Sequence, residues 1–153
     1  MKIFFVICLF LSSFAFANSV CQLNNPDYFI DESFFGSNGY IVDFSVPEHA
    51  IYKVYKKNEL DGFVLCSRQD FSNGEMEIVI TYDVNKNVKN LYFQKLFFDG
   101  SEKFNNLTFT TQFMNYKDLS KISNISKEFP EIFNSIIKGV EKNVSIVENY
   151  NGN

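Results

Sequence analysis

The chain has 153 residues, of which 46% are hydrophobic and 21% charged, and its formal net charge is −4. The basic residues are scattered and form no stripe, which argues against nucleic acid or an anionic membrane surface as a partner. The length suits one domain with a single hydrophobic core, and no linker interrupts it.

The first residues have the pattern of a secretory signal peptide. Lys2 supplies a positive charge, residues 3–11 are apolar, and Ala15-Phe16-Ala17 is the small-x-small motif that signal peptidase cuts after. An uncleaved membrane anchor would need about 20 apolar residues, and this run is shorter and contains Ser12-Ser13. We therefore expect cleavage near Ala17, a periplasmic or secreted protein with no stable membrane anchor in the mature chain, and one domain over residues 18–153.

Two cysteines, Cys21 and Cys66, lie beyond the signal peptide. Two thiols in an exported domain more often pair than stay free, so we expect a disulfide between them. In the chain-entropy model it contributes on the order of 3 to 4 kcal/mol to stability. The alternative is that Cys66, inside the apolar run Phe63-Val64-Leu65-Cys66, is a small buried hydrophobic residue.

The pattern along the mature chain starts with a short helix and continues with strands. Asn25-Pro26-Asp27 is typical of a helix start and Gly36 of a stop, which predicts a helix over residues 26–35. Alternation and β-branched or aromatic residues predict strands over 40–46, 50–56, 62–68, 75–82 and 88–98.

Three further features complete the predicted fold. Residues 58–62 carry the Asp-Gly hairpin signal, and the strand over 88–98 is apolar on both faces, as a central strand is. We expect residues 101–115 to be irregular, with room for one short strand. From Pro130 the period becomes helical, with one apolar stripe: Ile132, Phe133, Ile136, Ile137, Val140, Val144 and Val147.

These elements predict an α+β fold. It consists of an antiparallel β-sheet meander, a short N-terminal helix and a long C-terminal amphipathic helix packed on the sheet.

Several enzyme chemistries are excluded by the residues present. His49 is the only histidine, so no multi-histidine metal site exists and any Ser-His or Cys-His pair must use it. The chain has no Cys-x-x-Cys, Gly-x-Ser-x-Gly or Walker motif. Hydrolysis would rest on His49 alone, and a solvated loop histidine is the simpler interpretation.

A set of short segments, taken in order, has a familiar arrangement. They are Phe34-Phe35-Gly36, Tyr52-Lys53-Val54-Tyr55, Leu60-Asp61-Gly62-Phe63, Gly74 with Ile78-Val79-Ile80-Thr81-Tyr82-Asp83, Lys86-Asn87-Val88-Lys89-Asn90-Leu91, and Gln112-Phe113. In order and spacing the chain resembles the FMN-binding domain of extracytoplasmic flavoproteins and of subunits of sodium-pumping and Rnf-type redox complexes. The resemblance covers residues 32–147.

The resemblance also implies a cofactor site. In that family the flavin phosphate is esterified to the last residue of a Ser-Gly-Ala-Thr motif just before the final helix. Ser123, Asn124, Ile125 and Ser126 fall on this motif without a gap, so Ser126 takes the acceptor position and keeps a hydroxyl. A position ahead of a helix N-terminus suits a phosphate.

The motif nevertheless departs from the family pattern. Asn124 replaces glycine and restricts the backbone, Ile125 is bulkier than alanine, and Glu128 repels a phosphate where Ser or Thr is usual. The alternative role for Ser126 is a helix-capping or loop hydroxyl.

Two functions follow as expectations. The first is an exported FMN-binding-like protein that holds FMN, covalently at Ser126 or without a bond, and transfers electrons to a redox partner protein outside the cytoplasm. The second is a divergent domain that has lost the flavin and acts as a periplasmic or secreted binding or interaction module. Asn106, Asn124 and Asn143 lie in glycosylation sequons.

Overall fold

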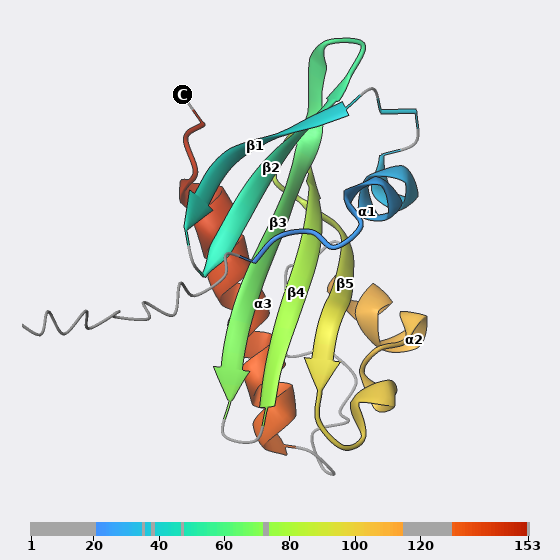
Figure 1. Ribbon diagram of the computed structural model, residues 1–153, viewed down its shortest axis with the longest axis vertical. Coiled ribbons are helices and arrows are strands. Elements are labelled where there is room, and N and C mark those ends of the chain that lie inside the picture. Colours follow the sequence, from blue (N-terminus) through green and yellow to red (C-terminus); the bar gives the residue numbers. More distant parts are fainter. Residues whose placement is uncertain are drawn as a thin grey trace, which may run out of the picture.

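The computed structural model describes the chain over residues 21–34, 36–37, 39–46, 48–71, 74–114 and 130–152 (Figure 1). These residues form a five-stranded antiparallel sheet in the order β1-β2-β3-β4-β5. A long helix covers one face of the sheet and a short helix the other (Figure 1). The predicted α+β class, with its meander and two flanking helices, is confirmed.

The elements have the following bounds: α1 Pro26–Ser33, β1 Gly39–Val46, β2 His49–Lys56, β3 Glu59–Phe71, β4 Gly74–Asp83, β5 Val88–Phe97, η1 Ser101–Lys103, α2 Leu107–Thr110, η2 Thr111–Phe113 and α3 Pro130–Asn149.

Helix α1 begins where the sequence predicts. The Asn25 side chain accepts a hydrogen bond from the Tyr28 amide at 3.3 Å, and Pro26 fills the first turn, where its missing N–H costs nothing. The helix ends at Ser33, two residues before the predicted end. There the Phe34 amide still donates to the Ile30 carbonyl at 2.6 Å.

The face of the sheet under α3 carries the larger core. Met76, Ile78, Ile80 and Tyr82 share this face of β4, as their alternation predicts, and all four are fully buried. Every residue of the predicted apolar stripe of α3 packs into the same core. At about 1.5 to 3 kcal/mol for each large side chain, this burial is the main force that holds α3 on the sheet.

Helix α3 runs antiparallel to β3. Near its middle a Cβ added to Gly139 would lie 2.9 Å from Gln69 Cγ, so the helix backbone closely approaches the sheet there. Just beyond its end, the Tyr150 ring lies edge-on to the Phe63 ring, with 6.0 Å between centroids. The helix thus spans β3 from its C-terminal half back to its start.

The opposite face carries a second core under α1. Phe29 and Ile30 of α1 pack with Val64 and Val79 of the sheet. The segment before α1 crosses this face (Figure 1) and adds Leu23 to the same core.

The predicted β2–β3 turn is wrong. The chain reverses at Lys57 and Asn58, whose φ values of 52° and 66° are those of a two-residue hairpin turn. Asp61 and Gly62 lie inside β3 instead. The glycine is required there by close packing, because a Cβ on Gly62 would lie 2.2 Å from the Tyr82 carbonyl oxygen.

Strand β5 is an edge of the sheet, which corrects the prediction of a central strand. Its two apolar faces have another cause. Leu91 and Phe93 face the α3 core, whereas Tyr92 contacts the Phe29 ring of α1 at 5.2 Å. An edge strand that packs against a core on each face of the sheet has the same apolar pattern as a central strand.

Residues 101–115 are expected to be irregular, with room for one short strand. The part described, residues 101–114, forms the helical turns η1, α2 and η2 and contains no strand. Asn106 caps α2 by accepting from the Phe109 amide at 3.0 Å. Phe104, Phe109 and Phe113 are buried, and their irregular spacing explains why no strand or helix period was visible.

Candidate functional site

The predicted flavin acceptor motif, Ser123, Asn124, Ile125 and Ser126, lies outside the described residues. Both flanks of the segment that contains it are described. Phe113 on one flank and Phe133 on the other contact the same Phe109 ring, with centroid distances of 5.3 and 6.4 Å. The described residues on the two flanks therefore belong to one aromatic cluster.

The chain length limits how far Ser126 can lie from α3. Ser126 precedes Pro130 by four residues, which is at most about 14 Å of extended chain. Helix α3 has 20 residues, and its N-terminus carries a partial positive charge that favours a phosphate. Glu131 in the first turn works in the opposite direction. The helix terminus favours the phosphate of a cofactor such as FMN, and Glu131 opposes it.

The predicted disulfide between Cys21 and Cys66 is confirmed. Both residues are fully buried, and the bridge ties the segment before α1 to β3. A buried disulfide is consistent with folding in an oxidising compartment.

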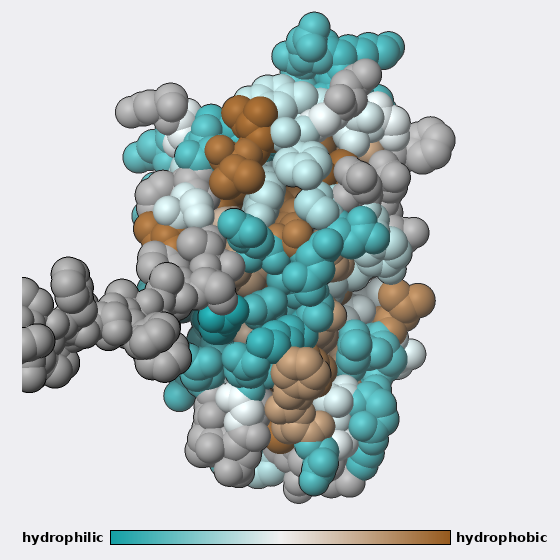
Figure 2. All heavy atoms as spheres, in the orientation of Figure 1, coloured by the Kyte–Doolittle hydropathy of each residue, from teal (hydrophilic) through white to brown (hydrophobic). Residues whose placement is uncertain are grey.

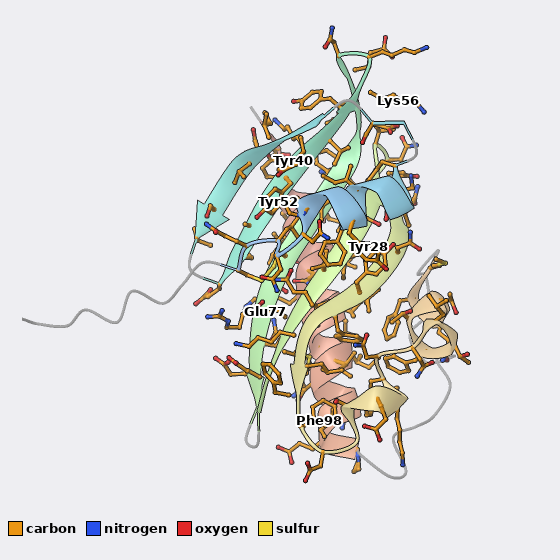
Figure 3. All side chains as sticks on the ribbon, turned by 45° about the vertical axis from the view of Figure 1, so that its right-hand side comes forward. Tyr28, Tyr40, Tyr52, Lys56, Glu77 and Phe98 are labelled. Atoms are coloured by element: carbon orange, nitrogen blue, oxygen red, sulfur yellow. A yellow bond between two sulfur atoms is a disulfide. The ribbon has the colours of Figure 1, made fainter. Side chains whose placement is uncertain are left out.

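A polar group on the α1 face is occupied by internal bonds. Arg68 donates to Glu77 at 2.6 Å, a bond that is the main reason for the raised pKa of Arg68. Gln94 donates to the second Glu77 oxygen at 2.8 Å and to the Gln22 carbonyl at 2.7 Å. The Gln94 side chain, held by Glu77 (labelled in Figure 3), thus anchors the segment before α1 to the sheet.

A second polar group continues along the same face. The Ser33 hydroxyl accepts from Thr81 Oγ1 and from Asn90 Nδ2, each at 3.0 Å, and lies 3.2 Å from the Tyr92 hydroxyl. These side chains satisfy one another and fix the end of α1. Their arrangement is structural.

His49 is paired in register with Ser67 on the neighbouring strand, on the face covered by α3. Asn143 lies one helical turn beyond Gly139 on α3. Ser67 and Asn143 are both fully buried, so the Ser67 hydroxyl is closed to a substrate.

The environment of His49 disfavours its charged form. Burial is the largest cause of its lowered pKa, Lys142 adds a repulsive charge, and Glu48 partly offsets both. His49 is thus a half-buried residue at the start of β2, which corrects the prediction of a solvated loop histidine.

Of the sequons, Asn143 is fully buried and cannot accept a glycan in the folded protein. Asn106 is exposed but its side chain caps α2. Asn124 lies outside the described residues.

The tyrosines on the two faces of the sheet have different environments. Tyr28 and Tyr40 are half-exposed on the α1 side, where the Tyr40 ring lies 5.9 Å from that of Tyr52 on the neighbouring strand (Figure 3). Burial raises the pKa of Tyr52, although the Leu23 amide donates to its hydroxyl at 3.1 Å. Burial also raises the pKa of Tyr82.

A cleft of about 370 Å³, which no sequence pattern predicts, opens at the C-terminal end of α3. Three separate parts of the chain line it: the β2–β3 hairpin, the turn before β5 and the residues that follow α3. The lining residues are Lys53, Tyr55, Leu60, Phe63, Lys86, Tyr150, Asn151 and Gly152. No sequence period connects these segments, so only the fold brings them together.

Comparisons with known proteins provide no relative. No family model matches the chain, no curated protein matches it, and no solved structure matches it.

Within the described ranges, no helix is long and apolar enough to cross a membrane. The same residues contain no group of three or more His, Cys, Asp or Glu side chains that could hold a metal ion.

Proposed function

We propose that the protein is an exported domain of the FMN-binding type that holds FMN next to the N-terminus of α3, with the flavin phosphate esterified to Ser126. FMN would supply one- and two-electron redox chemistry, and the protein would pass electrons to a partner protein outside the cytoplasm.

The observation that carries this proposal is the order of elements around the acceptor position. An antiparallel meander is followed by a long helix that begins four residues after Ser126. This is the position of the acceptor in the family that the sequence resembles.

Export is the second part of the proposal. The signal peptide pattern over residues 1–17 and the disulfide between Cys21 and Cys66 both support a periplasmic or secreted location. A flavin outside the cytoplasm is lost by diffusion unless it is tethered or tightly held, and this favours a bond to Ser126.

The alternative is a flavin-free binding or interaction module. Three residues favour it: Asn124 restricts the backbone where phosphate must approach, Ile125 is bulkier than the alanine of the family, and Glu128 repels a phosphate. Protein purified from its native host should show the visible absorption bands of oxidised flavin. A colourless preparation supports the flavin-free module and overturns the first proposal.

A further inference from the structure

The cleft at the C-terminal end of α3 has the composition of an anion site. Among the described residues that line it, Lys53 and Lys86 carry a charge and none is a carboxylate, although the whole chain carries a net charge of −4. A cationic cleft on an acidic protein selects for a negatively charged ligand.

Lys86 is held in place by its turn. The Asp83 carboxylate accepts from the Asn85 and Asn87 amides at 2.8 and 2.9 Å, and Lys86 itself has a left-handed φ of 66°. The Lys86 ammonium donates to the carbonyls of Glu148 and Tyr150 at 3.0 and 2.8 Å. Two of its three donor hydrogens are used, and no carboxylate among the described residues pairs with it.

Lys53 is the second cation. Its ammonium lies 3.1 Å from the Asp43 carboxylate and 5.8 Å from the centre of the Tyr150 ring. Asp43 neutralises part of this charge, and the pairing fixes the side chain toward the ring. Its side chain is only 14% exposed, so its charge acts in a partly desolvated site, where it counts for more than on the surface.

Aromatic rings supply the apolar part of the cleft. Tyr55, Phe63 and Tyr150 line it, and the edge-on contact between Phe63 and Tyr150 fixes both rings. Rings fixed in this way offer stacking surface to a planar ligand at little entropic cost.

We infer that this cleft binds a small aromatic anion, with the ring against the aromatic side chains and the acid group at Lys53 and Lys86. The site is distinct from the proposed flavin position. The cleft lies at one end of α3 and Ser126 precedes the other, and the helix ends are about 30 Å apart.

Titration of the full mature protein with 2-naphthoate, followed by calorimetry, tests this inference. The uncharged 2-naphthalenemethanol has the same ring and should bind at least about tenfold more weakly, because a charge-assisted hydrogen bond is lost. Equal affinity of the two probes, or no binding of naphthoate at millimolar concentration, overturns the inference.

Variants assign the binding to the cleft. Lys53→Met and Tyr55→Leu should each weaken naphthoate binding about tenfold, whereas Lys138→Met, which removes an exposed lysine of α3, should leave it unchanged. Lys86→Met is the third variant, with melting curves to confirm that α3 stays docked. Unchanged affinity in Lys53→Met and Tyr55→Leu rejects the site. Ser126→Ala should bind naphthoate with the affinity of the wild type, so a failure of the flavin proposal can be distinguished from a failure of this inference.

Discussion

At the scale of single residues, Gly62 is where the sequence and the packing are most closely connected. Its backbone φ of 159° resembles that of Gly39, at 152°, but only Gly62 has close neighbours. A Cβ there would meet the Tyr82 carbonyl oxygen and, at 2.4 Å, the Phe34 ring. A Cβ on Gly39 would have nothing within 4 Å.

We expect Gly62→Ala to lower the free energy of unfolding by about 2 to 3 kcal/mol more than Gly39→Ala does. Both changes carry a similar backbone cost, so their difference isolates the steric clash. Urea denaturation of the two variants measures it. Equal losses of stability would show that β3 and α1 are less closely packed at this point than described.

His49 gives the protein a pH-dependent stability. Burial, with the charge of Lys142, lowers its pKa in the folded state below 6.5, so between these two pKa values the unfolded chain binds more protons. Stability is therefore full above about pH 6.5 and falls as the pH drops toward the folded pKa.

Because His49 is the only histidine, the variant His49→Gln should remove most of this slope between pH 8 and pH 5.5. Chemical denaturation across this range provides the comparison. An unchanged slope in the variant would assign the effect to other groups.

At the scale of elements, the disulfide decides whether α1 and the segment before it stay on the sheet. The bridged cysteines lie 45 positions apart in the sequence. Loss of the bridge should lower the free energy of unfolding by on the order of 3 to 4 kcal/mol. Melting temperatures with and without reductant measure the effect. The Cys21→Ala/Cys66→Ala variant should have the melting temperature of the reduced wild type, and reductant should not change it. A wild-type melting temperature that reductant does not change contradicts this account.

The elements with a clear period were predictable from sequence. The apolar stripe of α3 and the alternation in β4 each follow from one geometric repeat, and both lie where they were expected. The β2–β3 turn was not predictable from its Asp-Gly pair, because packing against Phe34 and Tyr82, distant in sequence, is what requires Gly62. The edge position of β5 was not predictable either, because it depends on contacts between segments that are distant in sequence.

The sites differ in the same way. The Cys21–Cys66 disulfide could be predicted, because the chain after residue 17 has two cysteines, and in an oxidising compartment each has only the other as a partner. The cleft could not be, since Lys53, Lys86 and Tyr150 come from three remote segments. No local sequence pattern indicates that these three residues lie close together.

At the scale of the whole molecule, the two ends of α3 differ in chemistry. Near its start, Phe133 joins the aromatic cluster around Phe109, and the cationic cleft lies beyond its C-terminal end. The α1 face, by contrast, shows a hydrophilic band across its middle (Figure 2), and exposed apolar atoms lie over β1, where Ile41 and Val42 are 50% and 55% exposed. The two proposed sites are therefore structurally independent.

The central claim is the covalent flavin, and the mass of the denatured protein from its native host tests it most directly. We expect the wild type to carry the added mass of FMN less one water. The control Ser135→Ala should carry it too, because the Ser135 hydroxyl lies on α3 and donates to the Glu131 carbonyl. Ser126→Ala should lack it. A wild-type protein at its unmodified mass, or a flavin mass that persists in Ser126→Ala, would contradict the claim.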